Sequence, residues 1–153
     1  MTAGDPVARR LVSLADRYRA QLAGVALVGA CAVPGAAGGT LTPGRDGAVG
    51  VGWSDLGDRL EVQVLAPDGG GRFPTVGRTP EDVALLECLL DAVVAGHARQ
   101  VTAHGRSRVE ITLDTGPVTD ADAAADGLRW PRRVTRTDFR AYRERKPLAS
   151  RRR

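Results

Sequence analysis

The strongest constraint on the fold is a helix-forming segment, residues 80–95, that is apolar around most of its circumference. Thr79 can cap this helix, and Pro80 fits its first turn. Glu81 and Asp82 follow near the positive end of the helix dipole. The apolar positions are Val83, Leu85, Leu86, Leu89, Leu90, Val93 and Val94. Because so apolar a helix must be covered from two sides, we predict a central core helix between a sheet and a second helix.

The second helix is predicted at about residues 6–22, where apolar residues recur in steps of four and three. Asp5 can cap this helix, and Pro6 fits its first turn. The recurring positions are Val7, Leu11, Leu14, Tyr18 and Leu22. Most of the charged residues fall on the other side, so the sequence predicts an amphipathic helix with one buried face.

Five segments with inward-facing apolar residues predict strands. They are residues 48–53, 60–64, 72–78, 99–104 and 108–114. The alternation is clearest where Leu60, Val62 and Val64 are interleaved with polar residues. Pro74 indicates an edge strand, because proline cannot donate to the ladder. Gly105 lies in the turn of a hairpin formed by the last two segments.

The apolar run at residues 25–33 predicts a further, buried strand, and residues 34–47, rich in glycine and proline, predict a long loop. The end of the run, Val28-Gly29-Ala30-Cys31, is similar to a bacterial lipobox, which would be cleaved before Cys31 and acylated on it. Arginines precede the run, but so do two aspartates of the predicted N-terminal helix. We therefore prefer a buried strand in a cytoplasmic protein, with a lipoprotein anchored at Cys31 as the alternative.

Together these elements predict one α+β domain, as expected for 153 residues. A mainly antiparallel sheet of about five or six strands would pack against the core helix (about 80–95) and the N-terminal helix (about 6–22). A short helix is also predicted over residues 137–146, capped by Thr137 and stopped before Pro147. No run approaches the ~18–20 apolar residues of a transmembrane segment.

The last part of the chain differs in charge from the rest. Residues 129–153 contain eleven Arg or Lys and two acids, Asp138 and Glu144, a net charge of +9. Residues 1–128 contain eleven basic and sixteen acidic residues, a net charge of −5. Such a contrast suits contact of the basic end with the acidic body, with a complementary protein or with nucleic acid.

This charge boundary also sets the predicted organisation of the chain. We assign residues 1–128 to an α+β globular domain. Residues 129–148 form a basic C-terminal segment that we expect to dock on this domain through its aromatic residues. Residues 149–153 are predicted to be a disordered basic tip.

No motif for catalysis, for a metal or for a phosphate group is present in the sequence. His97 and His104 stand at no metal-ligand spacing, and the glycine-rich stretches lack the P-loop and dinucleotide patterns. We interpret Cys31 and Cys88 as buried, inert thiols, which are typical of a reducing cytoplasm. We therefore predict no cofactor and no metal. A small enzyme whose site is assembled across loops stays as the third functional hypothesis.

The best fit to these features is a non-enzymatic accessory or inhibitory protein of the immunity type in bacteria, which binds a protein partner through complementary acidic and basic surfaces. A second copy of the chain is a further candidate partner. The alternative is nucleic-acid binding by the Arg-rich C-terminal segment, against which the acidic body and the lack of a known motif count. The predicted partner-binding residues are Arg129, Trp130, Arg132, Arg133, Arg136, Phe139, Arg140, Tyr142 and Arg143, with the acidic pair Glu87 and Asp91 on the core helix.

Overall fold

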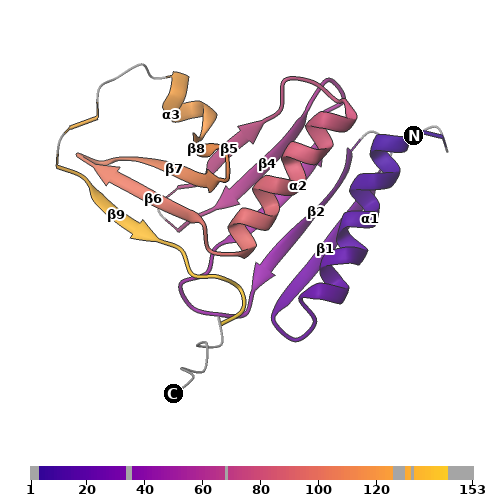
Figure 1. The fold of residues 1–153 in the computed structure, drawn as a ribbon, viewed down its shortest axis with the longest axis horizontal. Helices are drawn as coiled ribbons and strands as arrows, with labels where there is room; N and C mark the ends of the chain where they lie inside the picture. Colours follow the sequence, from indigo (N-terminus) through magenta and orange to yellow (C-terminus); the bar gives the residue numbers. More distant parts are fainter. Residues whose placement is uncertain (1–3, 34–35, 68, 126–129, 132, 145–153) are drawn as a thin grey trace, which may run out of the picture.

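Two antiparallel sheets and three helices make up the described part of the chain, residues 4–33, 36–67, 69–125, 130–131 and 133–144 of a computed structural model (Figure 1). The helices are α1 (Pro6–Gln21), α2 (Pro80–Val94) and α3 (Ala121–Ala125). The first sheet has the order β1 (Ala26–Val33), β2 (Ala36–Pro43), β3 (Gly50–Asp55), β4 (Leu60–Leu65), β5 (Gly71–Pro74). The second sheet has the order β8 (Gly116–Thr119), β7 (Arg106–Leu113), β6 (Ala98–Ala103), β9 (Thr135–Asp138). The predicted single α+β domain is confirmed, but its strands form two antiparallel sheets instead of the one sheet that was expected.

Both long helices cover the same face of the first sheet (Figure 1). α1 packs on β1 and β2, whereas α2 packs on β3 and β4 and also reaches β7 of the second sheet. Leu11, Leu86, Val62 and Ile111 come from four different elements and are all fully buried in one core. The structure therefore confirms α2 as the central core helix.

α1 begins and packs as its sequence predicts. The Oδ1 atom of Asp5 accepts hydrogen bonds from the backbone N–H groups of Val7 at 3.0 Å and of Ala8 at 3.4 Å. All five recurring apolar residues of the segment are buried. In addition, the Nε1 of Trp53 donates to the carbonyl oxygen of Leu11 at 3.2 Å, which fixes the helix on β3.

α2 is held at its start by a reciprocal capping box. The backbone N–H of Asp82 donates to the Thr79 hydroxyl at 3.2 Å, and the Thr79 N–H donates to the Asp82 carboxylate at 2.8 Å. Most of the predicted core positions are buried, but Leu85 is exposed, where α2 borders a hollow beside the end of β7.

The predicted loop at residues 34–47 is wrong, because β2 occupies most of it and lies between β1 and β3. A Cβ on Gly39 would lie 2.3 Å from Cζ2 of Trp53, and one on Gly38 would lie 2.2 Å from the carbonyl oxygen of Trp53. These two glycines are therefore required by packing. In the sequence they are indistinguishable from the flexible glycines of a loop.

The predicted burial of residues 25–33 is also wrong. β1 is the outer strand of the first sheet, and α1 covers only one of its faces. Leu27 is consequently 77% exposed, and the thiol of Cys31 is free and exposed as well. The lipobox-like run is thus part of a folded edge strand. Among the described residues, no helix has the length and apolar character needed to cross a bilayer.

The second sheet contains two strands, β8 and β9, that the sequence did not predict. Its hairpin β6–β7 turns through His104 at φ 50° and Gly105 at φ 73°, the positive values of a type I′ turn. The helix predicted at residues 137–146 is wrong. β9 pairs with β6 instead, and the N–H groups of Phe139 and Tyr142 donate to the carbonyl oxygens of Ala98 and Val94.

Candidate binding surface

The basic end of the chain is attached to the body through residues 133–144, which we call the tail segment. Phe139 and Tyr142 are buried in the main core. The Tyr142 hydroxyl donates to the carbonyl oxygen of Val49 at 2.7 Å, and burial raises the pKa of this hydroxyl above its usual range. These two predicted partner-binding residues therefore serve as internal anchors. Their packing fixes the backbone that carries the neighbouring arginines on the surface.

The acidic pair on α2 lies against the arginines of α1. The Nε of Arg10 and the Nη1 of Arg17 lie 2.8 Å and 3.3 Å from the Glu87 carboxylate. The Asp91 carboxylate accepts from Arg17 at 3.2 Å and from the Tyr18 hydroxyl at 2.6 Å. Burial, and then this hydrogen bond, raise the pKa of Tyr18. The acidic pair, which was predicted to bind a partner, thus joins the two helices, although the Asp91 side chain stays 58% exposed.

A second cluster ties the start of both helices to the first sheet. The guanidinium of Arg78 binds the buried Asp55 carboxylate at 2.7–2.9 Å, and it also binds Asp5, the cap of α1. The hydrogen bond from Arg78 is the main reason why the pKa of Asp5 lies below its usual value. Arg78 is therefore a structural cation that links β3, α1 and the segment before α2.

The arginines of the second sheet are also engaged. Both Arg99 and Arg108 lie 2.7 Å from oxygens of the buried Glu110 carboxylate. Burial alone would raise the pKa of Glu110, but the hydrogen bond from Arg99 and the charge of Arg108 together hold it below its usual value. The guanidiniums of Arg108 and Arg106 stack on the ring of Trp130, 4.5 Å and 5.3 Å from its centroid. Trp130 thus has cation–π contacts within the molecule.

The tail segment breaks this pattern of internal pairing. Arg133, Arg136 and Arg140 are exposed, and none of the three has an acidic partner among the residues that the structure describes. Arg143 donates to the carbonyl oxygen of Gln21. Body arginines with an ion-pair partner are, besides those above, Arg19, Arg45, Arg59 and Arg72. Arg129 and Arg132, also predicted to bind a partner, lie outside the described residues.

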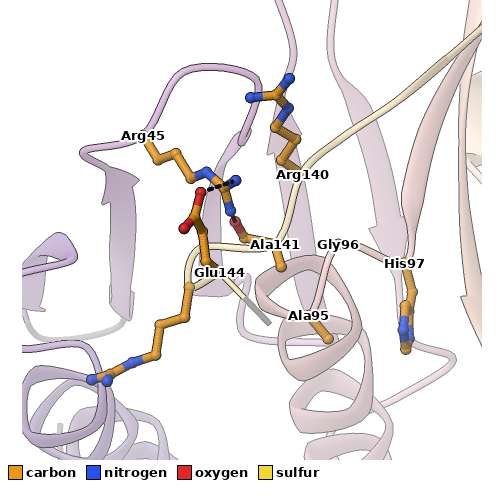
Figure 2. A pocket seen from close by; sticks show the side chains of 8 residues that line it. Arg45, Ala95, Gly96, His97, Arg140, Ala141 and Glu144 are labelled. Carbon is orange, nitrogen blue, oxygen red and sulfur yellow. Dashed lines mark hydrogen bonds and ion pairs between the residues drawn. The ribbon is translucent and has the colours of Figure 1, made fainter. Parts of the chain in front are cut away.

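A hollow of about 640 Å³ lies beside the tail segment, where it crosses the end of α2 (Figure 2). Its lining is rich in cationic side chains and comprises Arg45, Ala95, Gly96, His97, Arg140, Ala141, Arg143 and Glu144. Arg45 is bound within the hollow, 3.1 Å from the Glu144 carboxylate and 3.3 Å from the carbonyl oxygen of Ala141. Figure 2 shows the Arg140 side chain directed away from this pair. The Arg140 guanidinium thus takes no part in the Arg45–Glu144 ion pair, and its residue is exposed.

Another hollow, of about 500 Å³, lies between α2 and the β7–β8 turn. It is lined by the thiol-bearing Cys88, by His97 and by Asp91 and Asp114, among apolar residues. Cys88 is exposed, so its predicted burial in the core is wrong, because this side of α2 faces the hollow. A thiol, an imidazole and carboxylates are the groups of a nucleophilic site, which requires the base within hydrogen-bond reach of the thiol. This hollow is where the enzyme hypothesis would place a reaction.

No group of three or more possible metal ligands occurs in the described part of the chain. Comparison with family models, with curated proteins and with solved structures returned no match.

The edge strand β9 is the part of this candidate surface that the sequence did not predict. Its residues, Thr-Arg-Thr-Asp, place two β-branched threonines two positions apart, a weak strand signal. Thr137 is also a typical helix-cap residue, and this signal favours a helix over a strand in the sequence. The excess of positive charge could be predicted from composition. Whether Arg133, Arg136 and Arg140 have acidic partners depends on contacts between distant segments, and none is present among the described residues.

Proposed function

We propose that this protein is a small non-enzymatic accessory or inhibitory protein that binds an acidic segment of a partner protein at its tail segment. The observation that carries the proposal is the unpaired state of Arg133, Arg136 and Arg140 among the described residues, in a molecule that pairs most of its other arginines with carboxylates. Unpaired, ordered arginines favour carboxylate recognition, because their planar fork binds both oxygens of a carboxylate.

The strand β9 supports this mode of binding. Among the described residues, β9 is hydrogen-bonded to β6 on one side and to no strand on the other, and all four of its side chains are exposed. An extended peptide can add to such an edge as a further strand, with main-chain hydrogen bonds for affinity and side chains for specificity. Carboxylates of that peptide would then meet Arg133 and Arg136. Because Phe139 anchors the end of this strand in the core, little ordering entropy would oppose binding.

Nucleic acid is the competing anionic ligand. Binding of single strands commonly combines cations with aromatic rings on which bases stack. Here the exposed arginines are present, but Trp130 is already stacked by Arg106 and Arg108, and Phe139 is buried. An acidic protein segment needs only the cations and the open strand edge, so it is the better fit.

The test compares two anionic probes on charge-matched variants. Fluorescence anisotropy would follow a short glutamate-rich peptide and a single-stranded oligonucleotide of the same length. The test variant is Arg133→Gln/Arg136→Gln/Arg140→Gln. The control, Arg9→Gln/Arg19→Gln/Arg59→Gln, removes the same charge from exposed body positions. Deletion of residues 129–153 is unsuitable, since it would also remove the buried Tyr142.

We expect the peptide to bind the wild type and the control alike, and the tail variant to bind roughly tenfold more weakly or worse, about 1.4 kcal/mol. Equal binding of the peptide by all three proteins, or no binding at all, would contradict the proposal. Tighter binding of the oligonucleotide than of the peptide, lost in the tail variant, would assign the surface to nucleic acid instead.

A further inference from the structure

The two sheets end in four strands, and one of these edges is unlike the others. β5, β8 and β9 have four residues each. β5 carries Arg72 and Pro74, β8 carries Pro117, and β9 carries Arg136 and Asp138. β1 has eight residues, Ala-Leu-Val-Gly-Ala-Cys-Ala-Val, with neither a charge nor a proline. Short length, charge and proline are the devices that keep sheet edges from pairing with other chains, and β1 has none of them.

The backbone groups on the open side of β1 follow from its pairing with β2. The N–H of Gly44 donates to the carbonyl oxygen of Val25 at 2.9 Å, so Val25 and Gly44 form a hydrogen-bonded pair. Hydrogen-bonded positions alternate along an antiparallel ladder, so Leu27, Gly29 and Cys31 direct their backbone groups towards β2. The N–H and C=O groups between them, on Val28 and Ala30, consequently point to the open edge.

The side chains along this edge would not obstruct a further strand. Leu27, Gly29 and Cys31 lie on the face opposite α1 and are all exposed. Leu27 is a large apolar side chain that is 77% exposed. Among the described residues, the backbone groups on this edge have no partner, and apolar surface beside them is in contact with water.

We propose that a second copy of this chain pairs with β1 in antiparallel orientation, so that the two first sheets continue into one. A two-fold axis brings charges that lie close to it near their own counterparts, and proline removes a backbone donor. Among the edges of the described sheets, β1 alone has neither a charge nor a proline and is therefore suited to self-pairing. Directly opposed residues of an antiparallel pair lie on the same face of the sheet. The two-fold axis must therefore lie where a residue opposes its own counterpart in the second copy. An axis at Gly29 opposes Leu27 to Cys31 of the second copy and Val28 to Ala30. This interface does not rest on the proposed function of the tail segment.

The first measurement is the molar mass in solution over a range of concentration, by light scattering after size exclusion. The full chain should pass from monomer to dimer, and Leu27→Lys should weaken the dimer at least tenfold, because it replaces each apolar contact of Leu27 with Cys31 of the second copy by a charged side chain. The matched control is Leu65→Lys, an exposed leucine of β4 on the same face of the sheet, which should dimerise as the wild type does. A chain that stays monomeric at every concentration would overturn the proposal.

A cross-link tests the register directly. In a Cys88→Ser background, Leu27→Cys introduces a thiol opposite the native Cys31 of the second copy. These residues would form a non-hydrogen-bonded pair with Cα atoms about 4.5 Å apart, within the range of a disulfide. Mild oxidation should then give a covalent dimer, whereas Leu65→Cys in the same background should give none. A dimer that forms no Leu27→Cys cross-link and resists Leu27→Lys would show that β1 is not the interface.

Discussion

The arginines of the body and those of the tail segment carry the same group in different surroundings. In the body, Arg78 binds the buried Asp55, and Arg17 binds both members of the acidic pair on α2. In the tail segment, Arg136 and Arg140 extend from an ordered backbone without an acidic partner among the described residues. An arginine-rich composition therefore does not by itself indicate that a protein binds an anionic ligand. The useful signal is an ordered arginine whose charge the fold leaves unmatched.

The largest change in the free energy of unfolding is expected from substitution of the buried Tyr142 and not from substitution of the exposed arginines of the tail segment. Tyr142→Ala removes a fully buried ring and its hydrogen bond to Val49, and should lower the free energy of unfolding by about 4 kcal/mol. Tyr142→Phe keeps the ring and should cost about 1 kcal/mol. Urea denaturation measures both. If Tyr142→Ala unfolds at the wild-type midpoint, the tail segment is not part of the core.

A paired arginine of the body should matter more than an unpaired one of the tail. Arg78→Met leaves the buried Asp55 carboxylate without its cation and should cost about 2 kcal/mol. Arg140→Met exposes a similar volume and should change stability by less than about 0.5 kcal/mol. Thermal or chemical denaturation of the two variants gives the comparison. Equal losses would remove the distinction between the two groups of arginines.

Acid should lower the free energy of unfolding by protonating Glu110, which pairs with Arg99 and Arg108. The folded-state pKa of Glu110 lies below its ordinary value of about 4.3, since its bonds with Arg99 and Arg108 outweigh its burial. A depressed pKa contributes stability that is fully present above the unfolded pKa and is lost as the pH falls through the folded pKa. We expect Glu110 to account for a loss of about 1 kcal/mol between pH 7 and pH 3.

The control for this pH dependence is Glu110→Gln, which has no charge to titrate at this position. Its stability should fall less between pH 7 and pH 3 than that of the wild type. If both proteins lose the same free energy of unfolding, the ion pairs of Glu110 do not contribute to acid sensitivity.

Much of the fold could be predicted because its signals are local. The caps at Asp5 and Thr79 and the spacing of apolar residues after them predict α1 and α2 with their correct faces. β2 could not be predicted in this way. Gly38 and Gly39 are required by the ring and carbonyl of Trp53, which is distant in sequence. β9 was missed for a related reason, because its ladder depends on a free edge of β6.

The candidate surface shows the same division. The excess of positive charge at the end of the chain is a property of the sequence and was predicted from it. The sequence did not show that Phe139 and Tyr142 turn inward, or that Glu87 is bound by α1 arginines. Ion pairs between segments that are far apart in sequence determine which arginines stay available to a partner. Such pairs cannot be predicted from composition.

The central claim is that the tail arginines are not needed by the fold and are therefore available to a partner. Its most direct test is the free energy of unfolding of Arg133→Gln/Arg136→Gln/Arg140→Gln, measured by urea denaturation at low salt, where ion pairs contribute most. We predict a value within about 0.5 kcal/mol of the wild type. A loss of about 2 kcal/mol or more would show that these arginines belong to the fold's own ion pairs, and it would contradict the account.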